Sequence, residues 1–287
     1  MRIATFNAGL LDIRLAGRTL FEFTPHTRQR VKIVAECLRL LASELDLLCI
    51  QEVYHAADQQ LIASVTRKSL PFQFWPDVLP ALRLNSGLML LSRFKLITAD
   101  HNYFQRQSLD EFIFSKRGYI VSDICLSPYK VIRIVNTHLS SGGLLTHPES
   151  VRANRLRTNQ IGEIALLEPV ADILVGDLNC GPEAAPDNFQ QIIRLGYIDL
   201  ASSVSDGHRS PFYTWDPSNQ LNMASLHSSS PPQRIDHILA RLQSIEPGQR
   251  RSVARVLDEP FPLLDGITAT PSDHYGVKVD LALNYAT

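Results

Sequence analysis

The sequence has few cysteines and no long apolar run, and both features exclude certain classes of protein. Its four cysteines (Cys37, Cys49, Cys125 and Cys180) lie far apart and form no Cys-x-x-Cys pair. A zinc ribbon and a disulfide framework are therefore disfavoured, and we expect reduced thiols in a core. No apolar run approaches the roughly 20 residues of a membrane span. The N-terminus reads as a strand rather than a signal peptide, so we expect a cytoplasmic protein without a transmembrane segment.

An excess of charge of either sign is also missing. The 287 residues carry 28 Lys and Arg against 29 Asp and Glu, a formal net charge of −1. A nonspecific nucleic-acid coat protein would show a strong basic excess, although near-neutrality leaves a locally basic groove open. The hydrophobic share of 45% and the charged share of 20% are typical of a globular protein and exclude disorder, collagen and coiled coil.

Hydrophobic periodicity predicts alternating strands and helices. Apolar residues at helical spacing follow Thr27, and further helices are expected at about Ala57–Lys68, Ser150–Leu167 and Asp187–Leu195. Since no internal repeat or composition break divides the chain, we expect one α/β domain, mostly antiparallel, with helices covering two packed sheets. The predicted strands are Arg2–Asn7, Asp46–Ile50, Ser86–Ser92, Ile97–Asn102, Tyr119–Leu126, Val131–Asn136, Ile173–Val175, Arg234–Leu239, Ser252–Leu257 and Gly276–Leu283.

Polar residues stand at or just after the ends of several predicted strands, and Ser272-Asp273-His274 precedes the last one. Strand ends on a rigid sheet hold side chains in fixed mutual geometry. The set is rich in oxygen ligands and poor in sulfur, which suits Mg²⁺ or Mn²⁺ rather than zinc. Such a cation suits phosphoester hydrolysis, because it neutralises phosphoryl charge and activates water. The strand-end residues are Asn7, Glu52, Asn136, His138, Asp177, Asn179 and Asp236.

Each of these residues also has a structural explanation when taken alone. Asn7 could end a strand by bonding its own backbone, and Glu52 could favour a helix N-terminus. The segment Gly176–Asn179 is typical turn chemistry, and a lone histidine is commonly structural. Six such coincidences in one order along the chain favour a site.

Six short segments carry this pattern. They are Thr5-Phe6-Asn7, Gln51-Glu52-Val53, Asn136-Thr137-His138-Leu139, Gly176-Asp177-Leu178-Asn179, Arg234-Ile235-Asp236-His237-Ile238-Leu239 and Ser272-Asp273-His274. Together they resemble the endonuclease/exonuclease/phosphatase superfamily of metal-dependent phosphoesterases, over nearly the whole chain. The resemblance implies a DNase I-like α/β fold, a four-layer sandwich of two packed, mixed and mainly antiparallel sheets flanked by helices. Because residues 5 and 274 must meet in one site, we expect residues 1–287 to form a single domain.

The resemblance also implies a metal site. Glu52 would be the principal metal ligand, Asn7 a nearby ligand or phosphate contact, and Asp273 would lie beside the metal. The expected cofactor is Mg²⁺, with Mn²⁺ as the alternative.

Catalytic roles for five residues follow from the same resemblance. Asp177 would position or activate the attacking water, and Asn179 would orient the phosphate. His138 would donate to a non-bridging oxygen as charge builds there. His274 would act as general base or phosphate clamp, oriented by Asp236. Whether Asp177 or His274 takes the proton from water stays open.

Three further segments resemble neutral sphingomyelinases and favour a phospholipid head group as the phosphoester substrate. Phe212–Asn219 resembles their Thr-Trp-Asp-Pro-x-x-Asn segment, and Val151–Leu156 resembles the helix after their Thr-His. Ser115–Tyr119 resembles their Lys-Gly segment, where a lysine would approach the phosphate. The expected substrate contacts in these segments are Trp215, Arg152 and Lys116.

A lipid substrate also needs an apolar docking surface, and Pro260–Leu264 is the candidate for peripheral membrane contact. The contact residues would be Phe261, Leu263 and Leu264. The long aromatic hairpin with which secreted bacterial sphingomyelinases enter membranes is not found in the sequence.

Other branches of the superfamily remain alternatives. A nuclease, including a DNA-repair nuclease like the AP endonucleases, is favoured by arginines that could contact a nucleic-acid backbone. An inositol phosphatase is less favoured, because that branch carries a Trp-x-Asp-Arg signature where this chain has Arg234-Ile235-Asp236-His237. A catalytically inert binding module is disfavoured, since every expected catalytic position holds a competent residue. The arginines are Arg152, Arg155, Arg157, Arg250, Arg251 and Arg255.

Overall fold

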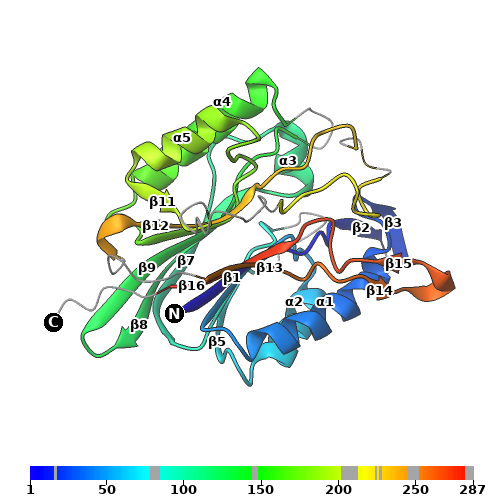
Figure 1. Ribbon diagram of the computed structural model, residues 1–287, viewed down its shortest axis with the longest axis horizontal. Coiled ribbons are helices and arrows are strands. Elements are labelled where there is room, and N and C mark those ends of the chain that lie inside the picture. Colours follow the sequence, from blue (N-terminus) through cyan, green and yellow to red (C-terminus); the bar gives the residue numbers. More distant parts are fainter. Residues whose placement is uncertain are drawn as a thin grey trace.

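Two six-stranded β-sheets form the centre of the computed structural model (Figure 1), which describes residues 1–15, 18–77, 85–143, 148–201, 213–223, 225, 228–244 and 252–281. In order across the first sheet, the strands are β13 (Ser252–Val256), β16 (Gly276–Asp280), β1 (Arg2–Asn7), β4 (Leu47–Gln51), β6 (Met89–Ser92) and β5 (Phe72–Phe74). Across the second sheet they are β11 (Tyr197–Asp199), β12 (Asp236–Arg241), β10 (Ile173–Asp177), β9 (Lys130–His138), β8 (Gly118–Ser127) and β7 (Lys95–Tyr103).

Each sheet contains one parallel pair, β1 with β4 and β9 with β10, while its other neighbouring strands are antiparallel. Asn7 is opposite Gln51 in the first sheet, and Asp177 is opposite both His138 and Asp236 in the second. Parallel neighbours end at the same edge of a sheet, and ligands commonly bind in α/β proteins outside such carboxyl ends. The register therefore gathers the polar residues that end four strands.

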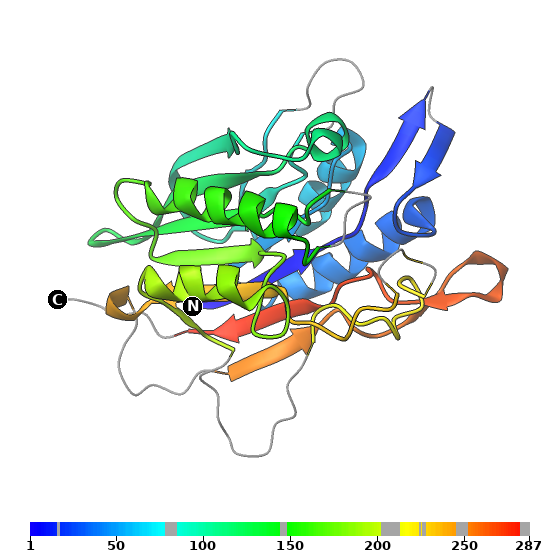
Figure 2. The same ribbon diagram turned by 90° about the horizontal axis from the view of Figure 1, so that it is seen from above.

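Helices cover the outer face of each sheet and complete four layers (Figures 1 and 2). α1 (Thr27–Ala42) and α2 (Ala56–Thr66) pack on the first sheet. α4 (Val151–Ala165) and α5 (Pro186–Arg194) pack on the second. The predicted four-layer sandwich of mixed, mainly antiparallel sheets is confirmed.

Alternation along the strands explains this layering, because successive side chains of a strand point to opposite faces. Ile3 of β1 contributes to the core between the sheets, whereas Ala4 and Phe6 pack beneath the first pair of helices. All four cysteines are free, and Cys49 and Cys180 lie fully buried in two different layers of the core.

Several short elements have no counterpart in the sequence prediction. A hairpin of β2 (Asp12–Leu15) and β3 (Arg18–Glu22) follows β1, and a smaller one pairs β14 (Phe261–Pro262) with β15 (Thr268–Ala269). α3 (Leu109–Phe114) begins at a capping box, in which the Ser108 side chain and the Glu111 side chain each bond the other residue's backbone N–H. The Ser-x-x-Glu spacing is a sequence signature of a helix start.

One predicted boundary differs in a way that matters for the site. The strand expected from Arg234 begins at Asp236 instead, because the backbone N–H groups of Ile235 and Asp236 both donate to the Thr214 hydroxyl at 3.1 Å. Thr214 belongs to the segment Phe212–Asn219, which resembles a segment of neutral sphingomyelinases. Phe212 lies outside the described residues, and so do Arg250 and Arg251. In the described parts of the chain, no helix has the length and apolarity needed to cross a bilayer.

Candidate active site

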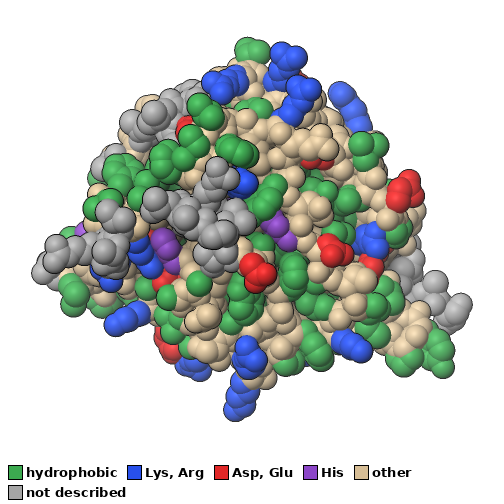
Figure 3. Space-filling view, turned by 180° about the vertical axis from the view of Figure 1, so that it is seen from behind, with side chains coloured by type: hydrophobic (Ala, Val, Ile, Leu, Met, Phe, Trp, Pro, Cys, Tyr) green, Lys and Arg blue, Asp and Glu red, His purple; other side chains and the backbone are tan. Residues whose placement is uncertain are grey.

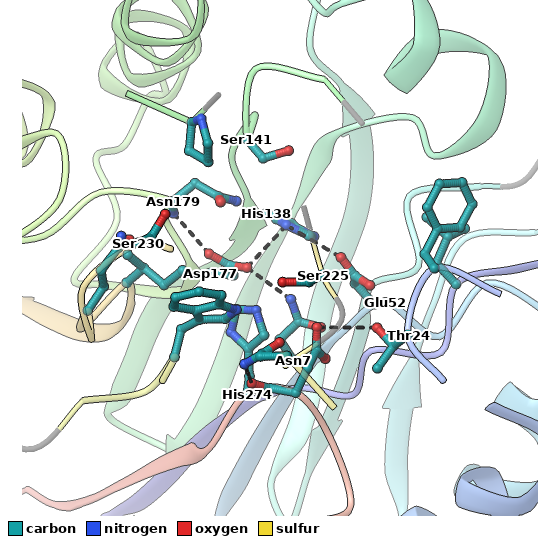
Figure 4. Close-up of a pocket in the computed structure, with 18 of the residues that line it drawn as sticks. Asn7, Thr24, Glu52, His138, Ser141, Asp177, Asn179, Ser225, Ser230 and His274 are labelled. Atoms are coloured by element: carbon teal, nitrogen blue, oxygen red, sulfur yellow. Dashed lines mark hydrogen bonds and ion pairs between the residues drawn. The ribbon is translucent and has the colours of Figure 1, made fainter. Parts of the chain in front are cut away.

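A pocket of about 420 Å³ lies where the strand ends of both sheets meet, and most of the predicted site residues line it (Figure 4). Asn7 and Glu52 stand at the ends of β1 and β4, and His138 and Asp177 end β9 and β10. His274 enters from the turn before β16. The volume is within the range of small-molecule sites. Three further predicted residues line the pocket: Asn179, Trp215 and Asp273.

Asp177 lies at the centre of the pocket floor. Its Oδ2 accepts a hydrogen bond from Asn7 Nδ2 at 2.9 Å and lies 3.2 Å from His138 Nε2, while Oδ1 accepts from the Asn179 backbone N–H at 2.9 Å. Burial acts to raise the pKa of Asp177, but the charges of His138 and His274 and the hydrogen bonds outweigh it and lower that pKa. Asp177 is therefore a carboxylate at neutral pH.

His274 and Asp236 form a buried pair beside it. His274 Nδ1 lies 2.9 Å from Asp236 Oδ2, which leaves Nε2 for a second partner. Burial alone would lower the pKa of His274, but the carboxylates of Asp236 and Asp177 raise it to about 10. Burial raises the pKa of Asp236 to about 6 against the opposing charge of His274. At neutral pH the two side chains form an ion pair.

Glu52 adopts a backbone conformation that non-glycine residues rarely adopt, with φ of 60°. Its carboxylate faces two cationic or polar groups without reaching hydrogen-bond distance, since Oε1 lies 3.8 Å from Arg117 Nη1 and 3.9 Å from His138 Nε2. Positive φ in a charged residue costs energy and is found mainly where function requires it. The backbone thus turns Glu52 into the pocket.

These groups fit a hard divalent cation. Carboxylate oxygens of Asp177 and Asp236 lie within 4.8 Å of one another, and the carboxylates of Glu52 and Asp273 line the same pocket. Asp236 Oδ1 is buried without a hydrogen-bond partner among the described residues, which is costly unless something else binds it. Carboxylate oxygens are the ligands that Mg²⁺ and Mn²⁺ prefer. The donor set therefore agrees with the cofactor expected from the sequence.

Asp273 is fixed at the edge of this group. Thr24 Oγ1 donates to its Oδ2 at 3.2 Å, and Ser272 Oγ donates to its Oδ1 at 3.0 Å. A Cβ at Gly9, where φ is +55°, would lie only 2.1 Å from Asp273 Oδ1. Only glycine permits this approach, so the loop after β1 is shaped around the Asp273 carboxylate.

His138 is held by a buried guanidinium. Arg117 Nη1 lies within 2.8 Å of both ring nitrogens of His138, and Arg117 Nε donates to Glu111 Oε1 at 3.3 Å. A guanidinium can only donate and the Asp177 carboxylate can only accept. Nε2, which lies 3.2 Å from Asp177 Oδ2, is the ring nitrogen that can carry a proton toward the carboxylate. Arg117 and Glu111 thus hold the His138 donor toward the pocket.

A family model for the endonuclease/exonuclease/phosphatase family matches residues 4–274. The chain belongs to this family. No curated protein is similar enough in sequence to give a match.

Solved structures of this fold resemble the chain at low sequence identity. A double mutant of beta toxin from Staphylococcus aureus with bound magnesium ions shares 16% identity over 97% of this chain and 98% of its own, with a TM-score of 0.74. Sphingomyelinase C from Streptomyces griseocarneus shares 18% over 98% of each chain, with a TM-score of 0.73. A humanized D. rerio TDP2 shares 17% over 99% and 98%, with a TM-score of 0.67. At these identities the likeness shows the fold alone.

Two of the three residues expected to contact the substrate, Lys116 and Arg152, do not line the pocket described above. Lys116 places its ammonium 4.8 and 4.7 Å from the ring centres of Tyr103 and Phe112, and it does not line the pocket. Arg152 is exposed on α4. Trp215 is buried, lines the pocket and bridges by its backbone to Gln233 and His274.

Of the arginines expected to contact a nucleic-acid backbone, some are exposed and others are held by contacts within the protein. Lys and Arg side chains gather at the upper edge of the molecule in Figure 3, the edge that carries α4 in Figure 1. Arg152 and Arg155 are exposed, but Arg157 is fully buried and donates to Ser140 O and Asn188 Oδ1. Arg255 lies over the Tyr275 ring, 4.5 Å from its centre.

Sequence reasoning missed Arg117 and Glu111. Arg117 directly precedes Gly118 in the segment likened to Lys-Gly, so the spacing favours Arg117 over Lys116 as its counterpart. The two residues differ in burial and position: Arg117 is only 3% exposed and lines the pocket, whereas Lys116 does not line it. Glu111 could have been found through the capping box, because that motif places its carboxylate at a helix start.

Proposed function

We propose that this protein is a Mg²⁺-dependent phosphodiesterase that hydrolyses a phospholipid head-group ester by in-line attack of water. The observation that carries the proposal is the convergence of Glu52, Asp177, Asp273 and His274 on one pocket, with Asp236 paired to His274. We extend the proposal to a single domain of residues 1–287, since the pocket draws on residues from Asn7 to His274.

The side chains divide the work around the scissile phosphate. Glu52 and Asp273 would hold the cation, with Asn7 alongside, and the bound cation supplies charge neutralisation at the phosphoryl oxygens. Asp177, kept ionised, accepts a hydrogen bond from the attacking water and orients it. His138 donates from Nε2 toward a non-bridging oxygen, a role in which fixed donors lower the barrier most.

His274 and Arg117 complete the arrangement. His274 has Nδ1 engaged by Asp236, so its Nε2 is available for proton exchange at the phosphate. Arg117 brings a permanent positive charge to the pocket wall, where Lys116 was expected to contact the substrate. Asn179 is anchored through Nδ2 to Leu139 O at 2.9 Å, which leaves its carbonyl oxygen to orient a substrate group.

Charge favours a zwitterionic head group over nucleic acid. Glu22 and Glu149 line the pocket in addition to Glu52, Asp177 and Asp273, against the guanidinium of Arg117 and the imidazolium of His274. Acidic groups remain in excess even with a divalent cation bound. A surface of that sign repels a polyanion and attracts a substrate whose phosphate is joined to a cationic group.

A side-by-side assay tests the proposal. Purified protein with Mg²⁺ is given sphingomyelin, lysophospholipid, abasic-site DNA and inositol phosphates, together with the variants Glu52→Gln and His274→Ala. We expect turnover of the choline lipids and a loss of about 10³-fold or more in both variants. Glu44→Gln, on the surface beside Lys278, is the matched control and should keep full activity.

Two results would contradict this function. Unchanged activity in Glu52→Gln or His274→Ala would remove the site assignment. Turnover of DNA alone would remove the lipid assignment and favour the nuclease alternative. A steep fall of DNA affinity with rising salt would then mark phosphate contacts.

A further inference from the structure

One wall of the pocket is apolar and comes from the β2–β3 hairpin. The hairpin and the residues after it contribute Phe21, Phe23 and Pro25 to the lining, next to Leu11. Phe21 is 54% exposed, and its ring meets the Phe23 ring edge to face, with centroids 4.8 Å apart. Figure 2 shows the hairpin projecting from the body of the molecule beside α1 and α2. Phe23 is only partly exposed, so the open apolar area of this wall is mainly the Phe21 ring, which a ligand in the pocket could cover.

A buried ionic network holds this hairpin in place. Asp12 in β2 is fully buried, and its carboxylate meets Arg14 Nε at 2.8 Å and His55 Nε2 at 2.6 Å. Arg14 also donates to Asp58 Oδ2 at 2.9 Å. His55 and Asp58 stand at the start of α2, so the hairpin is tied to the helical layer. A wall anchored in this way is a preformed surface rather than a loose loop.

The same wall is joined to the catalytic floor. Thr24, one residue after Phe23, donates its hydroxyl to Asp273 Oδ2 at 3.2 Å. Arg30, which is fully buried, donates to Pro25 O and to Pro271 O, just before Ser272-Asp273-His274. Phe21 and the catalytic floor therefore line one pocket, in which a group attached to the phosphate can meet the aromatic wall.

We propose that the Phe21–Phe23 wall binds the hydrocarbon group esterified to the phosphate, and so selects phosphodiesters with an apolar arm. This rests on the proposed phosphodiesterase function and names the part of the substrate that the hairpin recognises. A hydrocarbon arm suits this wall because the exposed Phe21 ring, with Phe23 beside it, offers apolar area and no hydrogen-bonding group. Covering exposed aromatic area removes it from water, and this favours binding of an apolar group.

The apolar segment expected to contact a membrane is placed differently. Leu263 is buried against Leu221 and Ala269, and Leu264 is 70% exposed without lining the pocket. Leu20 is the neighbouring case on the hairpin, since it is 63% exposed and does not line the pocket. Adjacent residues of a strand point to opposite sides, so Leu20 faces away from the side on which Phe21 lies. Leu20 can therefore serve as a control: it is exposed and apolar like Phe21, but it is not part of the proposed subsite.

Binding without turnover tests the subsite. Isothermal titration calorimetry in EDTA would compare methylphosphocholine with n-octylphosphocholine, two zwitterionic diesters that differ only in the length of the alkyl group, the latter kept as monomer, on the full chain. In the wild type we expect the octyl group to tighten binding. The gain is the ratio of the two dissociation constants, and we expect Phe21→Ser to reduce this ratio about tenfold. Phe21→Leu should keep part of the gain, and Leu20→Ser should keep all of it.

The outcomes separate this subsite from the proposed function. No octyl gain in the wild type, an equal gain in Phe21→Ser, or equal losses in Phe21→Ser and Leu20→Ser would each overturn the subsite. Failure of the wild type to hydrolyse any phosphodiester with Mg²⁺ would overturn the proposed function instead, because the EDTA measurement does not depend on catalysis.

Discussion

The floor and the rim of the pocket are built in opposite ways. The floor residues Asn7, His138 and Asp177 end strands of the two sheets, are at most 1% exposed and have neighbours that fix their geometry. The rim comes from connections, and its side chain Phe21 is half exposed. Strand ends held by sheet pairing on both sides cannot shift independently, whereas connections vary freely in length and sequence. We infer that the floor carries the chemistry and the rim the choice of substrate.

The largest test of this division is at the floor. Asp177→Asn keeps the shape of the side chain but removes the charge that faces His138 and His274, and we expect kcat/KM to fall by about 10³-fold with Mg²⁺ present. Asp187→Asn, in the exposed first turn of α5, is the matched control and should stay within twofold of wild type. Activity of Asp177→Asn within tenfold of wild type would place the chemistry elsewhere.

Glu111 is an exception to this division between floor and rim. It lies in α3, outside the strand ends, yet it supports a floor residue through Arg117. Its buried carboxylate receives Arg117 Nε, Ser140 Oγ at 2.6 Å and the Ser141 backbone N–H at 3.1 Å. Burial acts to raise the pKa of Glu111, but Arg117 and the serine hydrogen bonds lower it. Glu111→Gln leaves Arg117 without its buried counter-charge, which typically destabilises by about 3 kcal/mol.

We expect Glu111→Gln also to reduce kcat by about 10- to 100-fold, because Arg117 would no longer hold His138 in place. Steady-state kinetics well below the melting temperature separates this effect from the loss of stability. Glu163→Gln is the control, since Glu163 accepts the Gln105 backbone N–H away from the pocket. A lower melting temperature with unchanged kcat would show that Glu111 serves the fold alone.

Cation binding sharpens the comparison without any substrate. If Glu52 helps to hold a divalent cation, Mg²⁺ at 100 times its dissociation constant should stabilise the folded state by about 2.7 kcal/mol, or roughly 5 °C in melting temperature. Scanning calorimetry should show this shift in the wild type and in Glu36→Gln, on the exposed face of α1. It should be absent in Glu52→Gln. An equal shift in all three proteins would mean that Mg²⁺ binds elsewhere.

The floor could be predicted from the sequence because its residues follow regular strands. A strand has a fixed rise and alternation, so a polar residue at the end of an apolar run has a definite place once strands pair. Asn7, His138 and Asp177 were found in this way, and the structure brings them together. The fold class followed from the same regularity and from the order of the motifs.

The rim could not be predicted, since it depends on long-range contacts that leave no local pattern. The hairpin is held by Asp12 meeting His55, which lies 43 positions further along the chain. Lys116 and Arg117 are adjacent cations, and only burial against Glu111 and Tyr54 decides which one reaches the pocket. Arg157 looked like a surface charge beside Arg152, yet it is buried because carbonyl and amide oxygens surround it.

The smallest expected effect concerns a half-buried histidine outside the pocket, His101. His274 has Asp236 as partner, but His101 Nε2 is buried with no hydrogen-bond partner among the described residues, and burial lowers the pKa of His101 from 6.5 to about 4. The unfolded chain therefore binds this proton more readily than the folded one between pH 6.5 and 4. Folding stability should be highest above pH 6.5 and fall as the pH drops through this window.

His101 alone should contribute about 2 kcal/mol to that fall, after allowance for its partial exposure. His101→Phe keeps an aromatic ring against Tyr103, which His101 meets edge to face at 4.5 Å, and removes the titrating group. Denaturant unfolding of both proteins at pH 7 and pH 4 should show a smaller acid-induced loss in the variant. An equal loss would mean that water or another group satisfies the protonated ring, and that histidines outside the pocket are as well partnered as those on its floor.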